Sequence, residues 1–539
     1  MNKKSVCHYF SKTPEEAARE LYKKIPPNMV SVFWATFVFG ILTHIYIFTN
    51  TLVNQDSAIF LISDKDIMLS GRWFIREASS LSGIFQLPVV IGILSVVLIS
   101  LSAAFTVYIL RIKKKLFGCL IGMVMVSVPI IAGIFSFMFT ADAYAISLFL
   151  SVLCVFFAQK KGWKNSVLAA VALMFSVAIY QAYCQYALTL FVLLVLIEVL
   201  DYEKKPQQVL KEGVKYCAVF AGGLMAYRLV LAVMFSIKKV DSSFASLTMA
   251  DDFVNRIRTV FSLFRRNMVE FRGIYGYEAV KYIYILFILS SICFIVGYIG
   301  KQPKGNRFFR LCMAGALFCC IPVAQNILVI VTDTRVHNLT RYAFVLSVIL
   351  IVKLIDMLEI SPRKNWYTWA LCLGFAIVLW CNFLFTNECY LSLQLTNETS
   401  YALANRIVDR IETTAGWEED MPVLIVGNYD AALDDGNLCD TKPILHSRIE
   451  DVMGIVRLDY VYYRPYILYA YINDYIGKPL VKVTEEELER IQKTGEVESM
   501  GNFPAEDSVK VIDGVLVVRL YEPDWSLLNI LNESSNFVR

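Results

Sequence analysis

Two aspartates are the residues of this sequence best placed for acid–base chemistry. Asp56 follows the first long apolar run, and Asp142 lies where the third apolar run passes into the fourth. Carboxylates at such a depth in a membrane are costly and are usually retained for function. The pair predicts acid–base chemistry at the outer face of the membrane, on a substrate that is linked to a lipid.

The loop 50–86 that carries Asp56 also contains Gly71-Arg72-Trp73. A carboxylate that takes the proton from an acceptor hydroxyl can drive inverting attack on the anomeric carbon of a sugar. No second acid is needed when the leaving group is a phosphate, which the planar Arg72 fork can hold. The Trp73 ring can pack against the sugar. The alternative is that Asp56 caps a short helix and that Gly71-Arg72-Trp73 is an interfacial anchor.

Asp142 has an alternative role as N-cap of the fourth apolar helix, where aspartate is favoured. In the functional interpretation it orients the acceptor or stabilises positive charge at the anomeric carbon. Tyr180 and Gln181 lie at the outer turn between the fifth and sixth runs. They can line a polar pocket, or they belong to an aromatic belt at the membrane surface.

A second group of candidates is positively charged. Arg335, His337 and Arg341 crowd the short outer turn between the ninth and tenth runs, against the usual orientation bias. They predict binding of a lipid-linked phosphate, with a structural role as the alternative for His337. Arg228 lies inside the seventh run, where arginine usually faces a cavity or a partner, unless it snorkels.

Composition excludes an ordinary soluble protein, because the 539 residues are 57% hydrophobic with a mean hydropathy of +0.54. The 13 cysteines lie mostly in apolar runs, without metal-ligand spacing. No Gly-rich phosphate loop is present, which argues against a nucleotide donor. We predict no metal, no cofactor and no nucleic-acid partner.

Apolar runs of roughly 20 residues, long enough to cross a bilayer, recur along the chain. They predict an α-helical polytopic membrane protein with about eleven spans, if 165–200 forms two short helices rather than one. The spans are expected near 29–49, 87–110, 116–139, 142–159, 165–180, 183–200, 215–236, 281–300, 311–331, 342–358 and 366–386.

Loop charge favours two helices within 165–200. With two helices, the basic loops all lie on the same side of the membrane, which the positive-inside rule assigns to the cytoplasm. The N-terminus is then cytoplasmic, and the first span is a retained anchor rather than a cleaved signal peptide. The basic loops are 111–115, 160–164, 201–215, 301–310 and 359–365. The long outer loop 237–280 departs from the rule. Its apolar residues recur at helical spacing from Phe253 to Met268, which predicts an amphipathic helix that anchors on anionic lipid or binds phosphate.

We expect three parts: a cytoplasmic segment 1–28, a transmembrane domain 29–386 and a small extracytoplasmic α/β domain 387–539. In the last part, 398–413 predicts a helix and 422–427 a buried strand. The segment 511–518 predicts a strand pair joined at Asp513-Gly514.

Several short motifs follow one another in a recognisable order. They are the outer-loop Asp56, Gly71-Arg72 before the second span, Tyr180-Gln181 at a later outer turn, His337-Asn338-Leu339 with Tyr342, and Asn387 with Tyr390 at the start of the tail. Over roughly residues 30–415 this order resembles the Gtr-type membrane glucosyltransferases. These are serotype-converting enzymes that modify bacterial O-antigen, within the C-type polytopic glycosyltransferase superfamily.

The resemblance implies transfer of a hexose, typically glucose, from polyprenyl phosphate to a surface glycan, with inversion and with Asp56 as base. Family members often carry two adjacent acids at that position, whereas Gln55 and Ser57 flank Asp56 here, which adds weight to Asp142. Trp73 stands where a proline is expected. The phosphate clamp would come from Arg72, Arg228, Arg335 and Arg341.

Two other classes stay open. A transporter or flippase of lipid-linked glycans would need charges spread through the middle of the bundle. A glycan polymerase or ligase would favour two arginine-rich outer loops, and only loop 237–280 fits that pattern.

Overall fold

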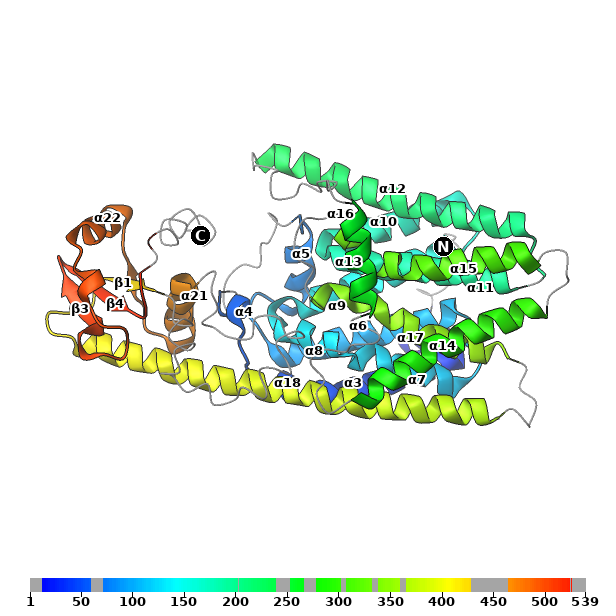
Figure 1. The fold of residues 1–539 in the computed structure, drawn as a ribbon, viewed down its shortest axis with the longest axis horizontal. Helices are drawn as coiled ribbons and strands as arrows, with labels where there is room; N and C mark the ends of the chain where they lie inside the picture. Colours follow the sequence, from blue (N-terminus) through cyan, green and yellow to red (C-terminus); the bar gives the residue numbers. More distant parts are fainter. Residues whose placement is uncertain are drawn as a thin grey trace.

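The protein is a helical bundle from which one long helix runs to a small α/β part (Figure 1). This computed structural model describes residues 12–59, 71–201, 203–238, 253–265, 278–301, 307–331, 338–358, 365–427, 464–523 and 525.

Eight helical segments of the described residues are long and apolar enough to cross a membrane. They are α3 (Pro27–Thr49), α6 (Pro88–Ile109), η3 (Met138–Thr140) with α9 (Ala141–Ala158), η4 (Gln181–Tyr183) with α11 (Cys184–Leu200), α12 (Pro206–Lys238), α14 (Glu278–Gly300), α15 (Arg307–Gln325) and α18 (Trp366–Thr413). A ninth crossing is formed if α7 (Lys115–Ser127) and α8 (Pro129–Ser136) are one span, bent by 42°. The bend falls before Pro129, because proline disfavours helical geometry in the residue that precedes it.

The predicted count of eleven spans is not confirmed. The two remaining predicted spans coincide with α10 (Trp163–Ile179), of 17 residues, and α17 (Val345–Asp356), of 12 residues. Both are shorter than the roughly 20 residues of a full crossing. The structure does confirm two helices within 165–200, since Tyr180 is extended and separates α10 from η4 and α11.

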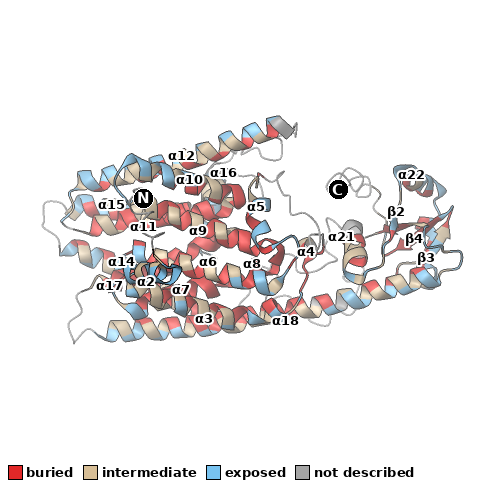
Figure 2. Cartoon of the chain, turned by 180° about the vertical axis from the view of Figure 1, so that it is seen from behind, coloured by how far each residue is buried: buried red, intermediate tan, exposed pale blue. Residues whose placement is uncertain are grey.

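Shorter helices cover the surfaces and ends of the bundle. They are α2 (Pro14–Lys24), α4 (Gln55–Ile59), α5 (Ile75–Ser79), η2 (Ser80–Ser82), α13 (Phe253–Arg265), α16 (Ile327–Val331) and η8 (Asn338–Phe344). Figure 2 shows buried residues concentrated in the inner helices, and the apolar window of Gln181–Leu200 is 78% buried against 28% for that of α12.

The amphipathic helix predicted within loop 237–280 is α13, of which Phe253–Arg265 is described. Its apolar side packs partly on protein, because Val260 and Leu263 are buried in one cluster with Val329 of α16. The Arg256 guanidinium donates to the carbonyl of Val329 at 3.1 Å. Anchoring on lipid therefore cannot account for the whole apolar face of this helix.

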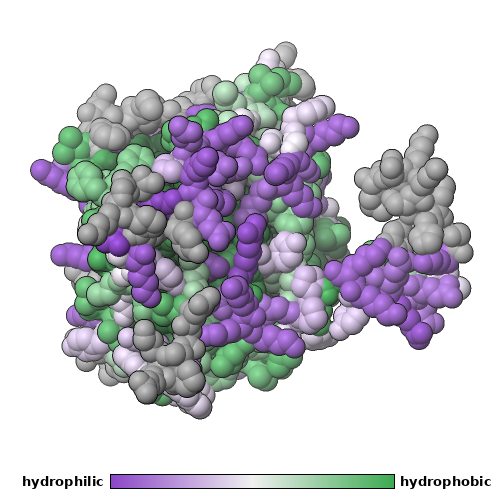
Figure 3. Space-filling view, turned by 90° about the vertical axis from the view of Figure 1, so that its right-hand side faces the viewer, coloured by the Kyte–Doolittle hydropathy of each residue, from purple (hydrophilic) through white to green (hydrophobic). Residues whose placement is uncertain are grey.

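The described basic loops meet at one end of the bundle. Asp356 of α17 accepts the backbone N–H of Lys113 at 2.8 Å, and Arg310 of α15 donates to the carbonyls of Val199 and Asp201, each at 2.7 Å. Figure 3 looks onto this end, where hydrophilic side chains gather across the face. The gathering agrees with the predicted loop arrangement, while the assignment of this end to the cytoplasm stays a prediction.

At the opposite end, α18 continues without a break into the C-terminal part (Figure 1). Its 48 residues give a length of about 70 Å. The helix contains both the predicted last span and the predicted helix 398–413, and it runs through the predicted domain boundary at 386–387.

The C-terminal part contains a four-stranded sheet in the order β2-β1-β4-β3. Its strands are β1 (Pro422–Val426), β2 (Val481–Lys482), β3 (Val509–Ile512) and β4 (Val515–Arg519), with helices α21 (Arg464–Ala470), η10 (Tyr471–Ile476), α22 (Glu485–Thr494), η11 (Val497–Ser499) and η12 (Glu506–Ser508) around it. β1 runs parallel to β2 and β4, and β3 pairs antiparallel with β4. The predicted buried strand and hairpin are thus confirmed. The turn residues Asp513 (φ 52°) and Gly514 (φ 79°) have the two positive φ values of a type I′ turn.

Candidate active site

Asp56 lies on the short helix α4, and Asn54 is the N-cap of that helix. The Asn54 side-chain oxygen accepts the backbone N–H of Ser57 at 2.7 Å and its hydroxyl at 2.8 Å. The alternative role of Asp56 as a helix cap therefore does not apply. Its carboxylate is half-buried and not committed to capping, as a general base requires.

The electrostatics of Asp56 also suit a proton acceptor. Burial raises the pKa of Asp56 above its usual range, and the nearby positive charge of Arg72 opposes that rise. A carboxylate with a raised pKa holds a proton more strongly than an exposed one, and this strengthens it as a base. Among the described residues, Arg72 acts on Asp56 through its charge and not through a hydrogen bond, so neither neutralises the other directly.

The loop segment at Gly71 is held against α12 and η4 of the bundle. The Tyr227 hydroxyl of α12 donates to the Gly71 carbonyl at 2.9 Å, and the Gln181 amide lies 3.5 Å from the same hydroxyl. Three residues on, the Phe74 N–H donates to the carbonyl of Ala178 at 3.1 Å. These contacts fix the backbone on both sides of Arg72.

We expect Gly71→Ala to damage the site more than the matched change Gly83→Ala in the same loop. Both glycines have positive φ, 76° and 94°, so either alanine costs about 1–2 kcal/mol of backbone strain. Only at Gly71 would the new Cβ meet other groups, the Tyr227 hydroxyl at 2.7 Å and the Gln181 amide at 3.2 Å. Thermal unfolding in detergent and transfer activity would be compared. Equal losses in the two variants would contradict the close packing at Gly71.

Arg72 lies against a pair of tyrosines that stack on each other. Its Nη1 donates to the Tyr144 hydroxyl at 3.2 Å, and its guanidinium carbon is 4.8 Å from the centre of the Tyr180 ring. The Tyr144 and Tyr180 rings stack with centroids 4.2 Å apart. The Arg72 Nε is buried and has no hydrogen-bond acceptor among the described residues. A buried guanidinium with unused donor capacity is suited to an anion.

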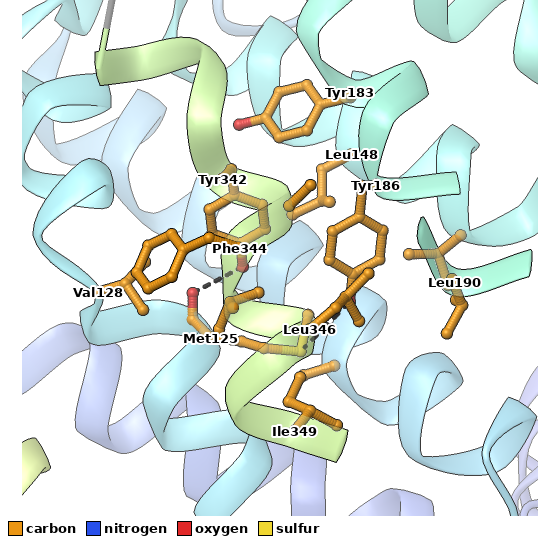
Figure 4. Close-up of a cluster of buried hydrophobic side chains, with 14 of the residues drawn as sticks. Met125, Val128, Leu148, Tyr183, Tyr186, Leu190, Tyr342, Phe344, Leu346 and Ile349 are labelled. Atoms are coloured by element: carbon orange, nitrogen blue, oxygen red, sulfur yellow. Dashed lines mark hydrogen bonds between the residues drawn. The ribbon is translucent and has the colours of Figure 1, made fainter. Parts of the chain in front are cut away.

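The aromatic contacts continue from Arg72 into the centre of the bundle. Tyr180 meets Tyr183, and Tyr183 meets Tyr342, each with ring centroids 5.8 Å apart. Tyr342 stacks on Tyr186 and donates from its hydroxyl to the Met125 carbonyl at 2.7 Å (Figure 4). This tyrosine ladder joins the turn at η4 to η8, which are far apart in the sequence.

η8 also carries Arg341, which is buried beside Tyr342 in the chain. The adjacent Thr340 carbonyl accepts the Gln185 amide of α11 at 2.6 Å. The structure therefore brings the segment of Arg341 to the same end of the bundle as Tyr180. Arg335 and His337 lie outside the described residues, and their phosphate-binding role stays a prediction.

Asp142 is fully buried in the first turn of α9. The N-cap of that helix is Thr140, and Asp142 Oδ1 accepts the backbone N–H of Ala143 at 2.8 Å. Two residues further on, Tyr144 reaches Arg72. Asp142 is thus not the N-cap, and it shares a helical turn with a residue that contacts Arg72. Its role on the acceptor stays a prediction.

The comparison with known families decides the class of the protein. Residues 45–358, more than half of the chain, match the family described as glucosyl transferase GtrII. The chain belongs to the GtrII family. No curated protein and no solved structure gives a significant match. The Gtr-type resemblance is therefore confirmed, and the protein is a glycosyltransferase. All ten predicted site residues lie inside the matched range.

Two further predicted residues of this GtrII protein lie where the sequence placed them, in the loop before α5 and within α12. Trp73 contacts Phe74 and Phe175, each with ring centroids 5.8 Å away, so the structure shows a packing role for its ring. Arg228 is half-buried on α12, next to the Tyr227 that holds Gly71. Their roles in sugar and phosphate binding remain predictions.

Sequence reasoning identified Tyr180 of this GtrII protein but missed Tyr144, which contacts Arg72, and Tyr227, which holds Gly71. Tyr144 follows Asp142 by two residues, and Tyr227 directly precedes Arg228, so proximity to a predicted residue was the available signal. Within the described residues, no group of three or more His, Cys, Asp or Glu side chains is placed to hold a metal. Metal independence stays a prediction.

Proposed function

We propose that this GtrII protein transfers glucose from a polyprenyl phosphate to an extracytoplasmic surface glycan, with inversion. Asp56 takes the proton from the acceptor hydroxyl as that oxygen bonds to the anomeric carbon. The bond between the anomeric carbon and the phosphate oxygen breaks, and its electron pair leaves with the polyprenyl phosphate. Arg72 holds the departing phosphate.

The arrangement of Arg72 supports this proposal most strongly. Its guanidinium is placed by Tyr144 and Tyr180, its Nε has no acceptor in the described protein, and a carboxylate lies nearby without forming an ion pair. A base and a phosphate holder that are close but not paired are the two groups that this reaction needs.

The position of the site in the fold supports the outer side of the membrane. The helices α4 and α5, which carry or closely follow Asp56 and Arg72, lie at the end of the bundle from which α18 continues to the C-terminal part (Figure 1). The Tyr180 turn adjoins them, because Arg72 contacts the Tyr180 ring. The described basic loops lie at the other end. Under the positive-inside rule, the site faces away from the cytoplasm and from its nucleotide pool.

The test is transfer from radiolabelled undecaprenyl-phosphate glucose by purified protein in liposomes, with an isolated surface glycan as acceptor. We expect a new glycosidic bond with inverted configuration, which product analysis by NMR would identify. Labelled lipid that crosses the bilayer without forming a new glycosidic bond would instead support the transporter alternative.

A further inference from the structure

A buried side chain of α18 fastens the loop of the proposed base. Asn397 of α18 accepts the Val53 N–H through Oδ1 at 2.8 Å and donates through Nδ2 to the Val53 carbonyl at 2.8 Å. The same Nδ2 donates its second hydrogen to the Leu393 carbonyl at 2.9 Å. Every hydrogen bond that this amide nitrogen can donate is therefore used.

Both partners are enclosed by protein. Val53 is fully buried and Asn397 is 8% exposed. Without Asn397, the N–H and the carbonyl of Val53 would lose their partners in a place where water does not replace them. Since Val53 directly precedes Asn54, the N-cap of α4, the clamp holds the residue just before the N-cap of the Asp56 helix.

The far side of α4 belongs to the core of the C-terminal part. Val53 and Ala58 pack in one apolar cluster with Ala404 and Ile407 of α18 and with Ile472 of η10. α4 also contacts α21 and η10, and Figure 1 shows α4 between the bundle and α21. The helix of Asp56 is therefore supported by α18 and the C-terminal part, whereas Arg72 is supported by the bundle.

We propose that Asn397 is a positioning residue, which sets the distance of Asp56 from the acceptor hydroxyl by clamping Val53. The inference rests on the proposed function, in which Asp56 is the base. Because a base misplaced by about 1 Å can cost 10²-fold in rate, release of the clamp lowers kcat. Donor binding changes little, because Arg72, Tyr144 and Tyr180 are held by other contacts.

The experiment compares the wild type with Asn397→Leu, Asn397→Asp and Asn405→Leu in liposomes. Asn397→Leu removes all three hydrogen bonds at similar volume. Asn397→Asp keeps an acceptor for the Val53 N–H and removes the donor. Asn405→Leu is the matched control, because the Asn405 amide donates to the Tyr401 carbonyl one turn earlier, within α18 itself. The measurements are kcat, donor KM, and hydrogen exchange of the peptide 50–59 by mass spectrometry.

We expect Asn397→Leu to lower kcat by about tenfold to 10²-fold, with donor KM changed by less than about threefold and faster exchange over 50–59. Asn397→Asp should fall between Asn397→Leu and the wild type, and Asn405→Leu should match the wild type. Exchange over 50–59 that is unchanged in Asn397→Leu, or a kcat within twofold of the wild type, overturns the proposal.

Asp56→Asn separates this proposal from the proposed function. Loss of transfer in Asp56→Asn with normal transfer in Asn397→Leu overturns the positioning role alone. Normal transfer in Asp56→Asn overturns Asp56 as the base, and with it the role of Asn397 in setting that base. The exchange measurement needs no reaction, so it decides whether Asn397 clamps the loop even if another sugar proves to be the donor.

Discussion

Asp56→Asn is expected to lower kcat for glucosyl transfer by about 10²–10⁴-fold, the usual contribution of a general base. Asparagine keeps the shape of the side chain but cannot take the acceptor proton. The fold should survive, because Asn54 and not Asp56 caps α4, and Asn397 holds the loop. Single-turnover transfer in liposomes measures the loss, and thermal unfolding in detergent checks that the variant is folded.

Asp142→Asn is the companion variant for this prediction. If Asp142 only orients the acceptor, its replacement should raise acceptor KM more than it lowers kcat. The base assignment is wrong if Asp56→Asn retains transfer while Asp142→Asn loses it. If both variants retain transfer, neither carboxylate carries the chemistry.

The pH dependence of kcat/KM follows from the state of Asp56. The base must be unprotonated, so activity falls as the pH decreases through its pKa. Burial raises that pKa. The acid limb of the pH profile, where activity falls on the low-pH side, therefore lies at a higher pH than an exposed aspartate would give. The limb should disappear in the residual activity of Asp56→Asn.

Arg72→Met is expected to lower kcat/KM for the donor by about 10²–10³-fold, because it removes the charge that stabilises the departing phosphate. The acid limb of the pH profile should also move to a higher pH. The positive charge of Arg72 holds the pKa of Asp56 down, so without it the carboxylate keeps its proton to a higher pH. The kcat/KM of the variant is measured across pH with labelled donor.

Two other variants give this prediction its controls. Arg72→Lys keeps the charge, so the acid limb should stay in place, while the loss of the planar fork still weakens donor binding. Arg76→Met removes the same charge four residues later, from an exposed side chain on α5, and should leave activity unchanged. Equal losses in Arg72→Met and Arg76→Met would indicate general attraction of the anionic donor rather than a specific phosphate site.

The apolar runs identified most of the membrane helices, because the number of apolar residues that a helix needs to cross a membrane can be counted in the sequence. The same criterion also predicted spans at α10 and α17, whose 17 and 12 residues leave the count of eleven unconfirmed. α17 begins only after the 3₁₀ segment η8, and apolarity does not distinguish a 3₁₀ segment from an α-helix. Loop charge did resolve the hairpin at Tyr180, since one helix there would have reversed the later loops.

The candidate site was only partly visible in the sequence. Asp56 and Arg72 share the loop 50–86, so the sequence places them close together. Their partners come from elsewhere: Tyr144 lies 72 positions after Arg72, and Asn397 lies 344 positions after Val53. Neither pairing has a local pattern, because packing of distant helices creates it. The hydrogen bond from Asn397 to Val53 could not be predicted from residue types alone.

The clamp at Asn397 has a consequence for how enzymes of this family can be recombined. The GtrII match ends at residue 358, before α18 begins at Trp366, yet it includes Val53 and Asp56. One side of the interface that supports Asp56 thus lies outside the matched residues. A chimera that exchanges everything after residue 365 would separate α4 from the surface that fits it. A chimera that keeps its activity should take residues 50–59 and the C-terminal part from the same parent protein. These two distant segments of the chain act as one structural unit.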